Sequence, residues 1–137
     1  MRRKLRNSVQ CCCAAVGAVL ILACQQQRTT ATGADPGGVY ALVSVDGKSL
    51  PATVSHENAD LQVRSGTFSI NANGTCSSKI TMVPPSGTEV TCEVNATYTK
   101  DGSKLKMQWK GAGRTVGTID GRTFIMENEG MVFVYKR

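Results

Sequence analysis

Apolar and polar residues alternate with a period of two along most of the chain after residue 38. The clearest case is the segment 104–110, in which Leu105, Met107 and Trp109 alternate with lysine or glutamine. A period of two places the apolar side chains on one face of a β-strand and the polar ones on the other. We therefore expect strands with one buried and one solvated face, and no helix in this part of the chain.

Short turns rich in glycine, proline, asparagine and aspartate separate the alternating segments. They delimit eight expected strands, at residues 39–45, 61–71, 76–83, 89–99, 104–110, 115–119, 122–127 and 131–136. The segment 49–54 contains Pro51 and is expected to be at most an edge strand. Because hairpins connect the strands in succession, we predict an all-β fold, a single antiparallel up-and-down barrel of about eight strands. A two-sheet sandwich is the second choice.

The first 24 residues differ from the rest and are typical of a targeting segment. A cationic start, with three arginines and a lysine in the first six residues, precedes an uncharged apolar run from Cys11 to Leu22. These are two parts of a secretory signal peptide. The run is shorter than the roughly 20 residues that a membrane-spanning helix needs. It ends in Ile21-Leu22-Ala23-Cys24, which resembles a bacterial lipobox.

The lipobox resemblance implies a processed, lipid-anchored chain. Residues 1–23 would be removed as a lipoprotein signal peptide, and Cys24 would carry acyl chains such as palmitate. Residues 24–38, which contain no large apolar side chain, are expected to form a flexible linker to a domain at 39–137. By analogy with enterobacterial sorting, Gln25 predicts an outer-membrane anchor facing the periplasm rather than an inner-membrane one.

Processing also changes the charge of the chain. The full sequence has 16 lysines and arginines against 10 acidic residues, a net charge of +6. Four of these cations lie in the expected signal peptide, so the mature chain is nearly balanced. Because no aromatic and basic patch accompanies the remaining cations, we expect no nucleic-acid partner. Two cysteines and one histidine beyond the leader and the lipid site are too few for a Cys/His metal site, and we expect no cofactor.

The two remaining cysteines are a candidate disulfide. An exported domain favours a bond between Cys76 and Cys92. A hairpin that turns at residues 84–87 would place Cys76 opposite Ala96 and Cys92 opposite Ile80. The two sulfur atoms would then be roughly 13 Å apart along the strands, whereas a disulfide needs Cα atoms within about 7 Å. The exported location favours the disulfide and the predicted strand register opposes it, so the pairing of Cys76 and Cys92 stays open.

Four segments resemble the lipocalin-like domains of small bacterial secreted proteins. They are VYALVSVDGK at 39–48, SGTFSINANGT at 65–75, MQWKGAG at 107–113 and GTIDGRTFIMENEGMVFVYK at 117–136. The resemblance implies a compact barrel whose interior holds a small apolar ligand. The segment LVSVDGK at 42–48 is also similar to the META/heat-shock-lipoprotein domain, which we rank lower.

Large apolar residues on the expected inner faces are candidates to line a ligand cavity. They are Tyr40, Phe68, Met107, Trp109, Phe124 and Met126. An eight-stranded barrel has an interior just wide enough for its own side chains or one small ligand. We therefore favour filling of the barrel by these residues over lining of a cavity.

The polar cluster formed by His56, Glu57, Asn58 and Asp60 lies in a connection that we expect to contain little strand. We interpret it as a solvated turn, because catalytic sets are assembled from separate elements. With no nucleophile, base and orienting group in evidence, we expect no enzymatic activity. The leading hypothesis is a monomeric, lipid-anchored envelope barrel that binds a small hydrophobic ligand. A periplasmic lysozyme or hydrolase inhibitor and a structural envelope protein are the alternatives.

Overall fold

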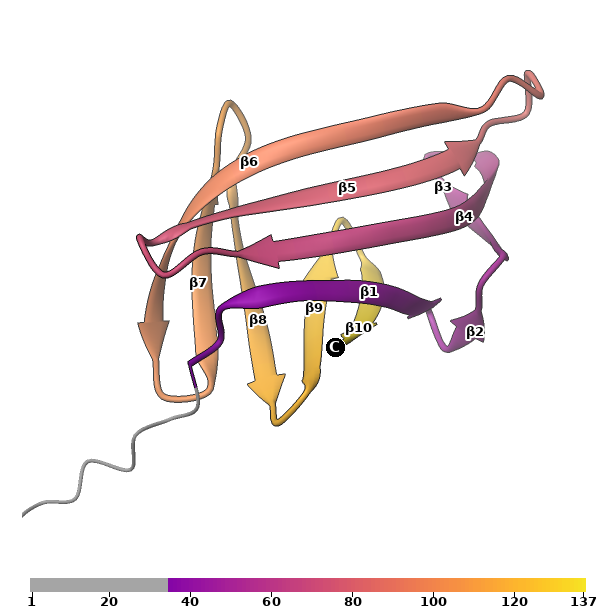
Figure 1. Cartoon of the computed structure of the whole chain (residues 1–137). Coiled ribbons are helices and arrows are strands. Elements are labelled where there is room, and N and C mark those ends of the chain that lie inside the picture. The colour runs from indigo at the N-terminus through magenta and orange to yellow at the C-terminus, as the bar shows by residue number, and fades with distance from the viewer. Residues whose placement is uncertain (1–34) are drawn as a thin grey trace, which may run out of the picture. The chain divides into compact units, whose positions relative to one another are not determined.

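The computed structural model describes residues 35–137, and Figure 1 shows this part of the chain as an all-β structure. The predicted signal peptide, Cys24 and most of the predicted linker lie outside the described residues. Within residues 35–137, no helix has the length and apolar character needed to cross a membrane.

Ten strands in the described part of the chain form one antiparallel sheet. They are β1 (Gly38–Val45), β2 (Lys48–Ser49), β3 (Ala52–His56), β4 (Ala59–Ile70), β5 (Thr75–Val83), β6 (Val90–Asp101), β7 (Lys104–Trp109), β8 (Arg114–Asp120), β9 (Thr123–Asn128) and β10 (Met131–Lys136). From β4 to β10 each strand pairs with its successor, and β1 pairs with both β10 and β4. This second pairing closes an eight-stranded barrel, so the predicted fold is confirmed.

Two register shifts occur in β1 and β4, the strands whose pairing closes the barrel. The β1–β10 register shifts between Leu42 and Ser44, and the β4–β5 register shifts between Val63 and Ser65. Gly66 follows the second shift closely in β4. A Cβ atom at Gly66 would lie 2.9 Å from Leu42 Cδ2. The missing side chain leaves room for the leucine.

Aromatic side chains fill the centre of the barrel. Tyr40, Phe68, Phe124 and Tyr135 are all fully buried. The ring centroid of Phe68 lies 4.5 Å from that of Phe124 and 5.6 Å from that of Tyr135. These tilted contacts are the geometry that aromatic pairs prefer, and each adds about 0.5–1.5 kcal/mol beyond area burial. The barrel is thus held together around a packed aromatic cluster.

The segment 49–54 differs from the expected single edge strand. The cis peptide bond between Leu50 and Pro51 separates β2 from β3, and β3 forms a hairpin with β4. Glu57 and Asn58, at the tip of this hairpin, are exposed and have positive φ angles of 48° and 65°. The exposed turn agrees with the expectation, but the prediction of a connection with little strand was wrong.

The first half of β6 also differs from the expectation. The alternation predicted that the apolar side of this strand would be buried, yet Val90, Cys92 and Val94 are exposed. β7 pairs with β6 only from Ala96 onward, while β5 pairs with it from Val90. The β5–β6 hairpin therefore extends past the barrel wall, as Figure 1 shows at the upper right.

Candidate functional site

The hairpin turns divide between the two ends of the barrel. One end, which we call the mouth, has the turns at 46–47, 57–58, 84–89, 110–113 and 129–130. The other, which we call the base, has the turns at 71–74, 102–103 and 121–122. The start of β1 and the end of β10 also lie at the base. The chain therefore enters and leaves at the end opposite the mouth.

A cavity of about 390 Å³ lies at the mouth, on the inner face of the sheet. Its apolar wall comes from five strands and consists of Ile80, Val94, Trp109, Met126 and Phe133. Met126 and Phe133 meet because they lie opposite each other in the register of β9 and β10. The alternation of β9 and β10 turns both side chains inward, one layer closer to the mouth than the Phe124–Tyr135 pair. The aromatic cluster therefore lies on the base side of this cavity.

A short relay of hydrogen bonds runs along one wall of the cavity. The buried indole Nε1 of Trp109 donates to Oγ1 of Thr115 at 2.6 Å, and this hydroxyl donates to Oδ1 of Asn128 at 3.3 Å. Each donor thus has an acceptor, so the indole is held with its ring against the cavity. Because Trp109 is the single tryptophan of the chain, its fluorescence reports on the surroundings of this one side chain, which include the cavity.

Two further hydroxyl groups, those of Ser78 and Tyr135, are buried in the interior. Ser78 is buried and lines the cavity, opposite Val94 in the register. Burial raises the pKa of Tyr135 to about 12. The nearby Ser78 side chain lowers this pKa, but by less than burial raises it. Nevertheless, the Tyr135 hydroxyl has no hydrogen-bond partner among the described residues. A buried polar group without a partner costs about 1–3 kcal/mol.

Charged side chains lie at the rim of the mouth. His56 Nε2, at the end of β3, lies 3.2 Å from Glu129 Oε2 in the β9–β10 turn. The sequence grouped His56 with Glu57, Asn58 and Asp60, but the contact that the fold makes is with a residue 73 positions away. Asp60 instead accepts a hydrogen bond from Ser55 at 2.6 Å. The cluster is therefore part of the rim.

The six candidate lining residues separate into two groups. Trp109 and Met126 face the mouth cavity. The other four, Tyr40, Phe68, Met107 and Phe124, are at most 1% exposed and belong to the packed core. Sequence analysis missed ten of the lining residues, among them Ser78, Ile80, Val94, Thr115, Asn128 and Phe133, which lie on strands. The alternation of apolar and polar residues indicates which side of its own strand each side chain faces. It does not indicate which residues of different strands lie at the same level along the barrel axis.

Both cysteines in the described residues are free thiols. The hairpin has the register derived from its turn, with Cys76 opposite Ala96 and Cys92 opposite Ile80. Cys76 is buried, and burial raises the pKa of its thiol to about 11, whereas Cys92 is exposed. The two thiols therefore differ in both position and accessibility.

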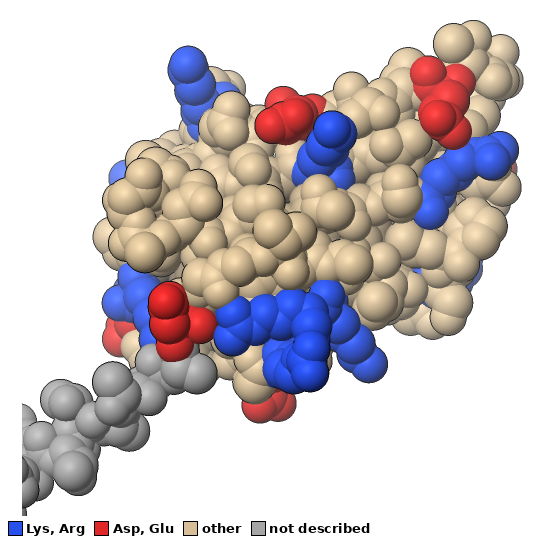
Figure 2. All heavy atoms as spheres, viewed as in Figure 1, with Lys and Arg blue, Asp and Glu red and all other residues tan. Residues whose placement is uncertain are grey.

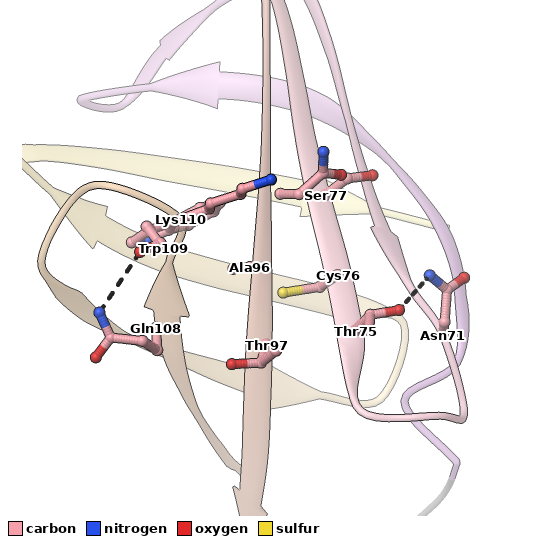
Figure 3. Close-up of a pocket in the computed structure, with 10 residues that line it drawn as sticks. Asn71, Thr75, Cys76, Ser77, Ala96, Thr97, Gln108, Trp109 and Lys110 are labelled. Carbon is pink, nitrogen blue, oxygen red and sulfur yellow. Dashed lines mark hydrogen bonds between the residues drawn. The ribbon is translucent and has the colours of Figure 1, made fainter.

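A second, open hollow of about 550 Å³ lies against β5, β6 and β7, and Figure 3 shows its polar lining. Asn71 Nδ2 donates to Thr75 Oγ1 at 3.0 Å, and Gln108 Nε2 donates to carbonyl groups of the β7–β8 turn. These polar groups are thus engaged in holding turns. We take the mouth cavity as the candidate site because it lies on the inner face of the sheet and joins an apolar wall from five strands to polar side chains at its rim.

Basic side chains gather at the base of the barrel. Arg122 Nε donates to the carbonyl oxygen of Arg137, and the Arg137 guanidinium lies 5.2 Å from the ring centroid of Tyr40 and donates to Gly37. Figure 2 shows a group of Lys and Arg side chains near the point where the described chain begins. Within residues 35–137, no three His, Cys, Asp or Glu side chains are grouped as metal ligands.

No family model, no curated protein and no solved structure matches this chain. The resemblance to lipocalin-like domains therefore stays a prediction. What can be inferred about function comes from the geometry of the barrel and its mouth.

Proposed function

We propose that this chain is a lipid-anchored envelope protein whose barrel binds a small, mainly apolar molecule at the mouth cavity. The observation that carries the proposal is the cavity itself, which has an apolar wall and is also lined by five polar or charged residues, Ser78, Arg114, Thr115, Asn128 and Glu129. Small-molecule sites combine apolar walls with a few polar groups, and the cavity stays open at the mouth although the aromatic cluster fills the centre of the barrel. The proposal includes no catalytic step.

The size and lining of the cavity limit the ligand. A volume of about 390 Å³ lies near the lower end of the range for small-molecule sites, roughly 300–1,000 Å³. Ile80, Met126 and Phe133 would contact an apolar body, while the Ser78 hydroxyl offers one polar contact on the wall. A medium-chain alcohol such as decan-1-ol has this combination and is a suitable probe.

The basic side chains at the base support the proposed anchor. They gather near the point where the described chain begins, and cations near an anionic lipid surface gain about 1 kcal/mol each. With Cys24 acylated, this group would favour contact with lipid headgroups.

Ligand binding is tested by titrating the protein with decan-1-ol while recording the fluorescence of Trp109. We expect a saturable change in emission, because the indole lines the cavity. Ile80→Phe should fill part of the cavity and weaken binding at least tenfold. Ile125→Phe is the matched control, since Ile125 is 40% exposed on the outer face of β9, and it should bind normally. A non-saturable response, or equal weakening by both substitutions, would contradict the proposal.

The anchor is tested separately in cells that express the full chain. Cys24→Ser should move the protein from the membrane fraction to the soluble fraction and abolish labelling by a fatty-acid analogue. Cys13→Ser, within the predicted signal peptide, should leave both unchanged. Membrane retention of Cys24→Ser with the same labelling would contradict the lipid anchor.

A further inference from the structure

The first half of β6 has a free edge. β5 pairs with one side of β6 from Val90 onward, but the pairs with β7 on the other side begin at Ala96. Beyond that point, the Lys110 N–H donates to the carbonyl oxygen of Asn95 at 3.0 Å. All residues from 90 to 95 are exposed. Figure 1 shows this part of β6 extending past β7 with no described strand beside it.

Strand geometry identifies the backbone groups at this edge. The N–H and C=O groups of one residue point to the same side of a strand, and successive residues alternate. The Asn95 carbonyl points toward β7, so Thr91 and Glu93 present their N–H and C=O groups on the same side, where no described strand follows. An unpaired row of this kind is a template for another strand.

We propose that this edge pairs with the same edge of a second copy of the chain, antiparallel and centred on Cys92. In this register Cys92 lies opposite Cys92 of the second copy, Val90 opposite Val94, and Thr91 opposite Glu93. Both Thr91–Glu93 pairs would exchange two backbone hydrogen bonds. The result is a two-fold symmetric dimer with one continuous sheet, in place of the monomer expected from the sequence.

The side chains favour a second copy over an unrelated strand because the edge is complementary to itself. Val90 and Val94, each 40% exposed, would cover one another at both ends of the paired segment. Glu93 would face the neutral Thr91, whose hydroxyl is already bonded to Thr81 at 2.9 Å. Centring the pair on Glu93 or on Thr91 would instead place Glu93 opposite another glutamate, Glu93 or Glu89 respectively. Like charges directly opposite each other destabilise a strand pair.

The position of Cys92 allows a covalent bond across this interface. Cys92 is a non-hydrogen-bonded position of the proposed pair, where opposite Cα atoms are about 4.5 Å apart. This separation lies within the range of disulfides, about 4.4–6.8 Å. Cys76 cannot take part in this bond, because it is buried and lies on β5, opposite Ala96 of β6. A short paired segment is weak by itself, so the disulfide would make the dimer durable.

The oxidation is a thiol–disulfide exchange with a disulfide donor such as oxidised glutathione. One Cys92 thiolate attacks the donor, forms a mixed disulfide and releases one donor thiolate. The Cys92 thiolate of the second copy then attacks the sulfur of the first, forms the Cys92–Cys92 bond and releases the other donor thiolate. Two protein protons are lost, and the donor gains both electrons.

The register can be tested by placing cysteines at the two valines. Chains that carry Cys92→Ser with Val90→Cys are expressed in full and solubilised with detergent from the cell envelope. They are mixed with chains that carry Cys92→Ser with Val94→Cys, and both are exposed to oxidised glutathione. The mixture should give a dimer band on a non-reducing gel. Each variant alone should not, because like positions would be separated by four residues, roughly 13 Å.

A second experiment tests the Cys92 disulfide itself, starting from the unmodified sequence. Full chains should form a dimer that reducing agent dissociates, and Cys92→Ser should abolish it while Cys76→Ala retains it. Val90→Lys should reduce the cross-linked fraction at least fivefold. Val116→Lys, at a position 50% exposed on β8 and away from this edge, should leave it unchanged. Equal cross-linking of the single and mixed variants, or a dimer that persists in Cys92→Ser, would overturn the proposal.

Discussion

Replacing Gly117 by alanine should destabilise the barrel strongly, because the centre of the barrel has no room for a methyl group. A Cβ atom at this position of β8 would lie 2.2 Å from Cε2 and 2.5 Å from Cζ of Phe124. It would also lie 3.2 Å from the backbone oxygen of Ile125. The φ angle of Gly117 is not in the left-handed region, so the expected effect is steric.

The Phe124 ring cannot move away easily. It is fully buried, and its centroid lies 4.5 Å from that of Phe68 and 5.8 Å from that of Tyr135. Overpacking of a close-packed core costs about 1–3 kcal/mol, and distances this short indicate the upper end. A loss of about 3 kcal/mol in the free energy of unfolding would lower the melting temperature of a domain of this size by roughly 12–24 °C.

The loss is measured by urea unfolding, with the fluorescence of Trp109 as the signal. Gly113→Ala is the matched control, because a Cβ atom there meets nothing within 4 Å, and it should change stability little. Phe124→Leu should cost less in the Gly117→Ala background than in the original chain, since the smaller side chain relieves the clash. Equal stability of Gly117→Ala and Gly113→Ala would refute the reasoning.

Three further predictions concern buried polar and titratable groups. In the folded protein after reduction, iodoacetamide at neutral pH should label Cys92, and it should label Cys76 only after unfolding, because burial raises the pKa of Cys76 to about 11; mass spectrometry of the labelled peptides checks this. The contribution of Cys76 and Tyr135 to the free energy of unfolding should be constant below pH 9 and fall between pH 9 and 12, because their folded-state pKa values, about 11 and about 12, exceed their ordinary values of 9.0 and 10.0. The unfolded chain then releases these protons first, at about 1.4 kcal/mol per pH unit and group, and Tyr135→Phe should remove the last part of the fall in a pH series of urea titrations. Thr115→Val should cost about 1–3 kcal/mol by leaving the Trp109 indole without an acceptor, whereas Thr118→Val, at an exposed position of the same strand, should cost little in the same assay.

The sequence predicts the strands well where alternation and turns agree. In β7, the expected order of Leu105, Met107 and Trp109 on the buried face is observed. The β5–β6 register follows from its turn, because the number of residues in a hairpin turn determines which residues lie opposite each other. Closure of the barrel follows from the need to cover one apolar face and remove the edges of the sheet.

Other features depend on contacts that alternation does not contain. The pattern of β6 shows which side is apolar, but burial of Val90 and Val94 requires a neighbouring strand that β7 does not provide. The hairpin tip at residues 57–58 has no glycine, so its left-handed residues gave a weak turn signal. The mouth cavity combines Ile80, Met126 and other residues from separate strands at one height, which is determined by the stagger of the whole barrel.

The central claim is that the mouth cavity binds a small apolar ligand, and methyl NMR of the protein labelled at its methionines tests it most directly. Met126 faces the cavity, whereas Met107 lies in the packed core, 1% exposed. On titration with decan-1-ol, we expect the Met126 resonance to shift saturably and the Met107 resonance to stay in place. An unchanged Met126 resonance at saturating alcohol would contradict the account.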